Sequence, residues 1–365
     1  MTDMRPLRIS IAMIVALLLC LGLIMIYSSS GVYASENLGD RTYFLKRQLI
    51  FLGIGSVFSF LIMSIDYRIL QQYSKWLLIG AFVMLLLVLI PGIGTSSFGA
   101  RRWFKLGPIS FQPSEFTKLA IMIYAADFLA RKQGKITNFL EGFLPLLIIM
   151  GSVCLLIIKQ PDLGSSVLIA SIILTLLYVA GTRLIYIGGL VLSAVPLLVY
   201  LVISEPYRMR RIIAFLDPWQ DSQGAGFQLS QSQIALGSGG IFGVGLGQSM
   251  QKLFYLPAAH TDFILSIIGE ELGLIGTLMT VLLFAAFIWQ GARIIKRTSN
   301  PFGYYLATGI VALIGMQAVV NIGVSIGAFP TKGLPLPFIS YGGSALVFNM
   351  LSVGLLLNIS RIEDI

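Results

Sequence analysis

The chain has 365 residues, of which 56% are hydrophobic and only 11% carry a charge. Soluble globular domains carry about 25% charged residues, so this composition excludes that class. The many aliphatic and aromatic residues exclude a disordered chain. The net charge of +9 comes from basic residues scattered between apolar runs, which favours anionic lipids over nucleic acid as partners. The sequence therefore predicts an integral membrane protein.

Long stretches without Asp, Glu, Lys or Arg predict the membrane spans. Nine apolar stretches of this kind have at least 17 residues, and 116–130 is apolar apart from Lys118 and Asp127. A membrane helix needs about 20 apolar residues, whereas barrel strands alternate over about ten. We expect an all-α integral membrane protein, a single polytopic domain over 1–365 with about ten transmembrane helices, at 9–28, 48–65, 76–91, 116–130, 142–158, 163–181, 184–203, 263–290, 303–328 and 340–359.

The orientation follows from the first span and from two basic clusters. The apolar run 9–26 is longer than the 7–15 residues of a signal peptide, so we expect a retained helix with the N-terminus in the cytoplasm. Both termini are then cytoplasmic, and 204–262 is a long extracytoplasmic loop in which Ser232 should be accessible. The count of Lys and Arg is 12 inside against 13 outside, but the clusters at 131–135 and 293–297 favour this assignment.

The surplus of cations on the outer side suggests an anionic ligand there. It comes from two groups, Arg101, Arg102 and Lys105, and Arg208, Arg210 and Arg211. Six glycines in 237–247 could cradle phosphate oxygens with backbone N–H groups or could form a flexible connector. Glu270 and Glu271 fall inside a membrane helix, where such residues are costly and mark a functional or pairing site.

Cysteine and histidine give little support for a metal site. Cys20 and Cys154 lie inside apolar runs, which excludes a disulfide framework and a CxxC site. His260 is the single histidine. No cluster of carboxylates fixes a site either, so Mg²⁺ or another divalent cation stays open as a cofactor without assigned ligands.

Five segments in order along the chain carry a resemblance to a known family. They are GARRWFKLG at 99–107, FQPSEFTK at 111–118, QPDLG at 160–164, LPAAHTDFILSIIGEELG at 256–273 and PTKGLPLPFISYGGS at 330–344. Together they resemble the SEDS family (shape, elongation, division and sporulation) of polytopic cell-wall polymerases, over nearly the whole chain. The last segment and 353–361 are more similar to the division members. The elongation members are the near alternative, which Pro335 keeps open.

The resemblance implies a peptidoglycan glycosyltransferase that polymerises lipid II on the outer face of the bacterial cytoplasmic membrane, for septal wall synthesis. It also implies a class B penicillin-binding transpeptidase and other division proteins as partners. The family's essential aspartate falls on Asp262, which we expect to be catalytic. The family motifs place the expected substrate-binding residues at Arg102, Glu115, Lys118, Asp162 and Ser344. Some elongation members have an arginine where this chain has Ser110.

The chemistry of glycan extension is compatible with these residue types. A sugar hydroxyl attacks an anomeric carbon and a lipid diphosphate leaves, so the reaction needs a base such as Asp262 and cations such as Arg102 and Lys118.

Each candidate residue also has a structural alternative. Asp262 and Asp162 could cap the helices that follow them, and Glu115 and Lys118 could neutralise each other at i,i+3. Glu270 and Glu271 are expected to order the bundle.

Two other functions remain open, a lipid flippase or transporter and a scaffold for another enzyme. The sequence shows no internal repeat, and its charged motifs gather on one face, which is not typical of transporters.

Overall fold

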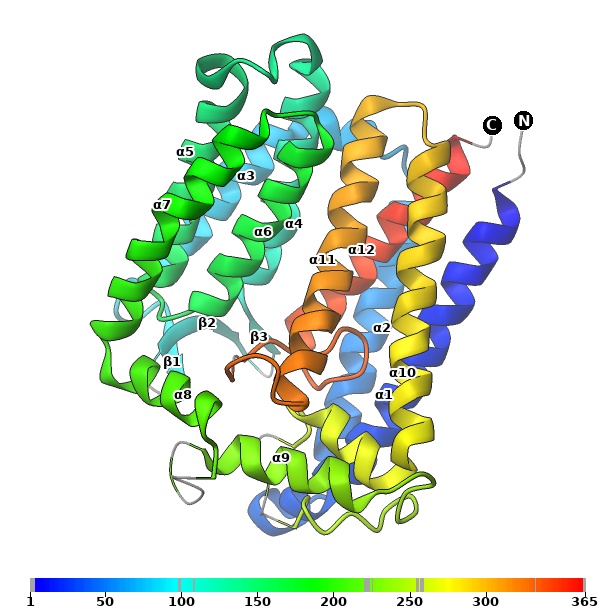
Figure 1. The fold of residues 1–365 in the computed structure, drawn as a ribbon. Helices are drawn as coiled ribbons and strands as arrows, with labels where there is room; N and C mark the ends of the chain where they lie inside the picture. Colours follow the sequence, from blue (N-terminus) through cyan, green and yellow to red (C-terminus); the bar gives the residue numbers. More distant parts are fainter. Residues whose placement is uncertain are drawn as a thin grey trace.

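The computed structural model describes residues 4–97, 100–107, 109–219, 224, 226–253, 256, 259–331 and 333–363. Within these ranges, twelve α-helices and three short strands follow one another (Figure 1). The first part of the chain forms α1 (Arg5–Leu38), α2 (Tyr43–Ser64), α3 (Ile69–Leu87), β1 (Thr95–Ser97), β2 (Ala100–Leu106), β3 (Ile109–Phe111) and α4 (Pro113–Arg131). A 3₁₀ turn (Gln133–Lys135) and a π turn (Phe139–Phe143) then lead into α5.

The second part is also helical. It forms α5 (Leu144–Ile158), α6 (Leu163–Val179), α7 (Leu184–Ile203), α8 (Pro206–Leu216), α9 (Phe227–Ser238), α10 (Ile264–Arg297), α11 (Pro301–Ser325) and α12 (Gly343–Ile362). A helix lies over each of the ten ranges predicted to span the membrane. The prediction of an all-α polytopic bundle is confirmed.

Eight of the described helices are long and apolar enough to cross a membrane by length and composition. Two helices of the bundle fall outside that set for different reasons. α6 is apolar but has only 17 residues, and α4 carries Glu115, Lys118, Asp127 and Arg131. α4 packs against α3, α6, α11 and α12, and most of its residues are buried. Glu115, Lys118 and Asp127 are therefore covered by protein rather than lipid, which is how a charged helix is tolerated inside a membrane bundle.

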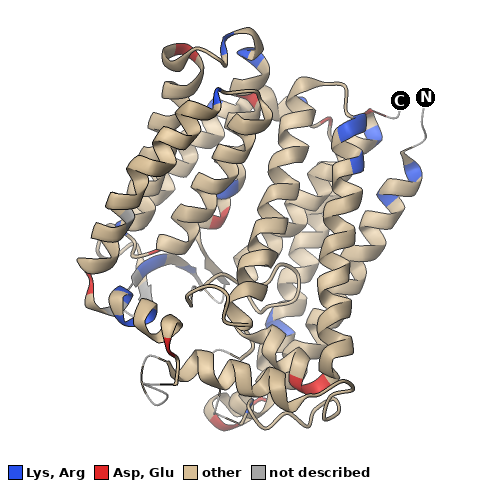
Figure 2. Ribbon diagram, in the orientation of Figure 1, with Lys and Arg blue, Asp and Glu red and all other residues tan. Residues whose placement is uncertain are grey.

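The two ends of the bundle are built differently. Both termini lie at one end, and the strands, α8, α9 and the chain between α9 and α10 lie at the other (Figure 1). Charged residues gather at these two ends and are sparse between them (Figure 2). We call the end with the strands and α9 the loop end. α7, by contrast, has no buried residue whose side chain is described, as expected for a helix that faces lipid.

The segment 204–262 is more ordered than a connector. It contains α8 and α9, and α9 packs against α10 and α11. The expectation that Ser232 is accessible is wrong. Its side chain is fully buried, hydrogen-bonded to the Ser266 hydroxyl at 2.5 Å and donating to the Ser325 carbonyl at 2.8 Å. Ser230 and Ser232 of α9 are thus buried in a helix interface rather than in a solvated loop.

A small antiparallel sheet in the order β1-β2-β3 is a further feature that we did not predict. Phe104 of β2 pairs with Phe111 of β3, and the two rings stack with centroids 6.5 Å apart. Gly107 follows β2 with a φ of +64°, a left-handed conformation that glycine adopts without strain. The sheet fixes β2, which carries Arg101 and Arg102, just before α4.

The glycine-rich segment 237–247 packs against a break in α10. Gly273 lies at this break with φ +68° and ψ −160°, so its backbone leaves the helical path. The freed groups bond to the segment: Val244 N donates to the Glu270 carbonyl at 2.9 Å, and Leu274 N donates to the Gly240 carbonyl at 2.9 Å. These bonds replace the helical ones that the break removes.

Steric contacts explain why the segment needs glycine. A Cβ at Gly239 would lie 1.9 Å from the Gly269 carbonyl oxygen, and one at Gly243 would lie 2.2 Å from the Glu271 carbonyl oxygen. Only glycine allows two backbones to approach this closely. The alternative of a phosphate cradle is not supported, because Gly239 and Gly243 contact α10 and the N–H groups of Val244 and Gly245 bond to it.

Candidate active site at the loop end

Asp262 lies at the loop end, two residues before α10 begins. Its backbone is fixed by Asn321 of α11, whose Nδ2 donates to the Asp262 carbonyl at 2.9 Å and to the Leu334 carbonyl at 2.8 Å. Asn321 is only 2% exposed, so this amide is a buried junction between three segments of the chain. The position of Asp262 is thereby set by α11 and by the segment before α12.

The residues before Asp262 are held by the same segment. Ser340 Oγ donates to the Thr261 carbonyl at 2.5 Å, and Tyr341 N donates to the His260 carbonyl at 2.9 Å. The ring of His260 packs against aromatic rings, Phe44 at 4.5 Å and Tyr341 at 5.9 Å between centroids. Burial lowers the pKa of His260 to about 4, so it is neutral at pH 7. His260 is therefore a packing residue of this turn.

The carboxylate of Asp262 is half-buried, and burial raises its pKa to about 6. The positive charge of Arg211, from α8, acts in the opposite direction and lowers it. Among the residues that the structure describes, none donates a hydrogen bond to this carboxylate. The alternative that Asp262 caps α10 is wrong, because Phe263 occupies the cap position and no side chain bonds there. The carboxylate is thus placed to accept a proton from a bound molecule.

Arg102 and Asp162 meet around one turn. The guanidinium of Arg102 donates from Nε to the Gln160 carbonyl at 2.8 Å and from a second nitrogen to the Pro161 carbonyl. Asp162 caps α6, accepting from Ser165 N at 3.0 Å and from its hydroxyl at 2.8 Å. The cap interpretation of Asp162 is confirmed. Arg102 therefore joins the small sheet to the N-terminus of α6.

Glu115 and Lys118 form a buried ion pair in the first turns of α4. Lys118 Nζ lies 2.7 Å from Glu115 Oε1, and the two side chains are 1% and 5% exposed. The predicted i,i+3 pairing is confirmed. Because the ammonium is covered, direct contact between Lys118 and a substrate requires this pair to open.

Ser344 joins α12 to the turn before α4. Its hydroxyl donates to the Ser110 carbonyl at 3.0 Å and accepts from Gln112 N at 3.1 Å. The side chain is only 5% exposed. Its contacts hold the start of α12 beside β3.

All six predicted site residues lie at the loop end, but they form separate groups. Leu334 is the link between Asp262 and the start of α6: its carbonyl shares the amide of Asn321 with Asp262, and a Cβ at Gly164 would lie 3.5 Å from its Cγ. Within the part of the chain that the structure describes, no hydrogen bond or ion pair joins Asp262 to Glu115 or Lys118. Leu334 thus contacts both the amide that holds Asp262 and the start of α6, whereas Glu115 and Lys118 of α4 form a second group.

An apolar groove begins beside this link. A pocket of about 550 Å³ lies between α6, α10 and α11, and Gly164 and Leu334 line one end of it. Its lining includes Thr308, Val311, Gly315 and Val319, which follow α11 for about three turns. A groove of this shape and polarity fits an aliphatic chain.

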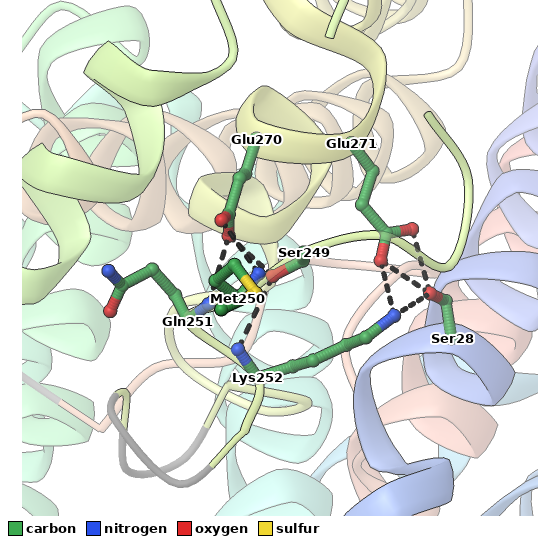
Figure 3. A network of polar contacts seen from close by, with 7 residues as sticks. All are labelled: Ser28, Ser249, Met250, Gln251, Lys252, Glu270 and Glu271. Carbon is green, nitrogen blue, oxygen red and sulfur yellow. Dashed lines mark hydrogen bonds and ion pairs between the residues drawn. The ribbon is translucent and has the colours of Figure 1, made fainter. Parts of the chain in front are cut away.

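A buried polar network orders the chain before Asp262 (Figure 3). Lys252 Nζ lies 2.8 Å from Glu271 Oε1, and Ser28 of α1 donates to the same carboxylate at 2.6 Å. Glu270 accepts from Met250 N at 2.9 Å and from the Ser249 hydroxyl. The expectation that both glutamates order the bundle is confirmed.

Sequence reasoning missed three residues of this region. Asn321 is one of two amides, with Gln317, in a mostly apolar run, and nothing in the sequence indicates that it would hold Asp262. Lys252 had no predicted partner, because its partner Glu271 lies 19 residues further along the chain, inside α10. Arg211 belonged to the noted cation surplus, yet its effect on Asp262 depends on the packing of α8. No cluster of three or more His, Cys, Asp or Glu side chains able to hold a metal ion occurs among the described residues.

Comparison with known proteins identifies the family. The family model for the FtsW, RodA and SpoVE cell cycle proteins matches residues 8–365. The chain is 46% identical over 361 residues to the probable peptidoglycan glycosyltransferase FtsW of Trichlorobacter lovleyi, covering 98% of this chain and 95% of that protein. It is also 46% identical over 351 residues to the stage V sporulation protein E of Bacillus subtilis, covering 96% of each.

Solved structures give the same answer for the fold. A chain of a peptidoglycan synthase complex that coordinates polymerization and crosslinking superposes with a TM-score of 0.81 at 27% identity, covering 97% of both chains. The rod shape determining protein RodA of Thermus thermophilus superposes with a TM-score of 0.71 at 26% identity, covering 96% of this chain and 95% of RodA. This multi-pass membrane protein belongs to the SEDS family of FtsW, RodA and SpoVE cell cycle proteins.

Proposed function

We propose that this protein is a peptidoglycan glycosyltransferase that polymerises lipid II for septal wall synthesis in cell division. Relatives named as probable FtsW glycosyltransferases, at 45 to 47% identity over nearly the full length, support this activity and the division role. The protein lies in the bacterial cytoplasmic membrane with both termini in the cytoplasm. The loop end, with Asp262, then faces the side on which the wall is built.

One observation supports the chemistry most directly. Asn321 holds the backbone of Asp262, and no described residue donates a hydrogen bond to the carboxylate. The pKa of this carboxylate is about 6. A base with a pKa slightly below the working pH is mostly ionised and still binds a proton well. Asp262 is therefore the residue best suited to take the proton of an attacking hydroxyl.

The proposed step is a direct displacement. The acceptor sugar hydroxyl of one lipid II attacks the anomeric carbon of another, and its proton moves to a carboxylate oxygen of Asp262. As the new carbon–oxygen bond forms, the bond between the anomeric carbon and the diphosphate breaks, and the diphosphate leaves on its lipid. Arg102 and Lys118 supply positive charge for the leaving group, the latter after its pair with Glu115 opens. Arg211 adds a third cation beside Asp262.

The other predicted site residues have structural roles in this proposal. Asp162 and Ser344 position the start of α6 and α12 through their hydrogen bonds. The groove between α6, α10 and α11 accommodates part of the lipid chain. A class B penicillin-binding transpeptidase is the proposed partner, supported by the similarity to a peptidoglycan synthase complex that couples polymerization with crosslinking.

The test is polymerisation of lipid II by the purified protein and by Asp262→Asn. Asparagine keeps the shape of the side chain and leaves the Asn321 bond to the backbone intact. We expect the variant to make glycan at least about 10²-fold more slowly, the low end of what a general base supplies. The variant should still bind lipid II. A variant rate close to that of the parent would contradict the role of Asp262.

The same assay separates the alternatives. Glycan product from the parent protein alone supports a polymerase. Transfer of labelled lipid II across a vesicle membrane without any product would instead identify a flippase. Activity that appears only with an added polymerase would identify a scaffold.

A further inference from the structure

A second polar pocket lies at the opposite end of the bundle from Asp262. It has a volume of about 400 Å³ and is formed by the start of α3 and the end of α4. Its lining is entirely polar and mostly cationic or amide: Arg68, Gln71, Gln72, Lys75, Asp127 and Arg131. The bond between Arg68 and Glu363, at 3.7 Å, places the pocket beside the C-terminus. We call it the α3–α4 pocket.

The acidic groups near the pocket are already bonded to other residues. Asp127 is 2% exposed and accepts from Arg131 at 2.8 and 2.6 Å and from the Ser74 hydroxyl at 2.5 Å. Glu363 accepts from the Tyr67 hydroxyl and from Ser299 N, both at 2.9 Å. These contacts satisfy both carboxylates, so neither is available to Lys75.

Among the described residues, one cation of the pocket is left without an acidic partner. Arg131 pairs with Asp127, and the charges of Glu363 and Asp66 both act on Arg68. Lys75 is exposed and makes no ion pair with any residue that the structure describes. Asp127 fixes the guanidinium of Arg131 from one side, while 48% of that side chain remains exposed. The missing partner is a group with a single negative charge and several acceptor oxygens, such as a phosphodiester.

The position of the pocket relative to the membrane surface indicates the source of this phosphodiester. Tyr73 and Trp76, on either side of Ser74 and Lys75 in α3, are 55% and 70% exposed. Exposed Tyr and Trp at the end of a membrane helix lie at the level of the lipid headgroups. Ile69, one turn earlier, is also exposed, at 43%. The pocket thus opens at headgroup depth on the membrane face that carries the termini.

We propose that the α3–α4 pocket binds the headgroup of an anionic phospholipid, with its phosphate between Lys75 and Arg131 and its polar alcohol against Gln71 and Gln72. A zwitterionic lipid fits less well, because its ammonium group would enter a cationic pocket. This binding goes beyond the glycosyltransferase activity and does not depend on it. None of these residues is part of the site around Asp262.

The experiment measures lipid retention on the full purified chain by native mass spectrometry. Detergent-solubilised protein is titrated with dioleoylphosphatidylglycerol, with dioleoylphosphatidylcholine as the zwitterionic probe. We expect the parent to retain phosphatidylglycerol preferentially. Lys75→Gln should weaken this retention about fivefold, the effect of one cation near a membrane surface. The matched control is Lys296→Gln, an exposed lysine near the end of α10 that does not line the pocket, and it should retain the lipid as the parent does.

Three outcomes would overturn the proposal. Equal retention of both lipids would remove the charge preference. Equal loss in both lysine variants would indicate general surface charge rather than a site. Displacement of phosphatidylglycerol by inorganic phosphate at a similar concentration would assign the pocket to a soluble phosphate instead of a lipid. Unchanged lipid II polymerisation by Lys75→Gln in detergent would show that the variant is folded.

Discussion

At the scale of single residues, Asp262 shows how burial and charge set a reactive group. Removal from water raises its pKa to about 6, and Arg211 limits the rise. The side chains of Asn321 and Ser340 donate hydrogen bonds to backbone carbonyls of the turn and do not bond to the carboxylate. A side chain bonded by several donors would have a lowered pKa and would be a weaker base. Asp262 is therefore suited to its proposed role because its backbone is held in place while no described residue bonds to its carboxylate.

The pH dependence of turnover tests this description. The base must be ionised, so we expect kcat to be constant above the pKa of Asp262 and to fall about tenfold per pH unit below about 6. Arg211→Gln removes the charge that lowers this pKa, so the acid limb should move to higher pH. Arg210→Gln is the control, since the charge of Arg211, and not that of Arg210, lowers the pKa of Asp262. A profile measured with saturating lipid II that is flat through pH 6 would contradict the proposed base.

A second residue-scale prediction concerns Lys118. Lys118→Met leaves Glu115 charged and buried, and breaking such a pair costs about 3–5 kcal/mol. The double variant Glu115→Gln, Lys118→Met removes both charges, so we expect most of this stability to return in thermal unfolding measurements. Activity should not return, because the proposed cation for the diphosphate is missing. Recovery of polymerisation in the double variant would mean that the pair is only structural.

At the scale of elements, the break in α10 and the glycine-rich segment form one unit. The segment supplies hydrogen bonds to groups that the break leaves unpaired, and its glycines let the two backbones touch. Just before Gly273, Glu270 and Glu271 reach back to 249–252 and to Ser28. The turn that leads to Asp262 is thus fixed to α10 and to α1. Asp262, the proposed base, therefore keeps its position only while this unit is ordered.

Paired glycine substitutions test this unit. Gly243 has a φ of +80°, and a Cβ there would lie 2.2 Å from a backbone oxygen, so Gly243→Ala should lower the free energy of unfolding by at least about 1–2 kcal/mol. Gly237, in α9, has open space around its Cβ position and an ordinary φ. Gly237→Ala should therefore leave stability unchanged or raise it slightly, because alanine favours helix. Equal thermal unfolding of the two variants would contradict the close packing.

At the scale of the whole molecule, the bundle separates two chemically different ends. The loop end carries Asp262, Arg102 and Arg211, and the other end carries the termini and the α3–α4 pocket. α4 connects the two, with Glu115 and Lys118 near its start and Asp127 and Arg131 near its end. A charged helix of this kind is stable only in the centre of the bundle, where each charge has a partner. This arrangement favours a catalyst with one reactive face over a transporter with a site at mid-depth.

The proposed orientation can be tested by labelling single cysteines. Both native cysteines, Cys20 and Cys154, are first replaced by serine. Gln248→Cys is exposed at the loop end and should react with an impermeant reagent in intact cells, or in spheroplasts where an outer barrier exists. Ser299→Cys, exposed between α10 and α11, should react only after permeabilisation. The reverse pattern would invert the topology and place Asp262 in the cytoplasm.

The amino-acid composition alone identifies the class of the protein and locates the ten helices of the bundle. Partition of an apolar segment into a membrane depends on its own composition, so ten ranges could be located without any tertiary contact. The family motifs also identified Asp262 as the candidate base and placed the expected binding residues on one face. The i,i+3 pair of Glu115 and Lys118 and the cap at Asp162 could be predicted because their partners are close in the sequence.

Contacts between distant segments of the chain could not be predicted from the sequence. Asn321 holds Asp262 across 59 positions of sequence, and Lys252 pairs with Glu271 beyond a turn whose path no local pattern encodes. Ser232 is buried because α9 lies against α10 and α11, and the glycines of 237–247 contact a helix rather than a phosphate. A polar residue in an apolar chain signals that it needs a partner, but the identity of that partner is fixed by packing.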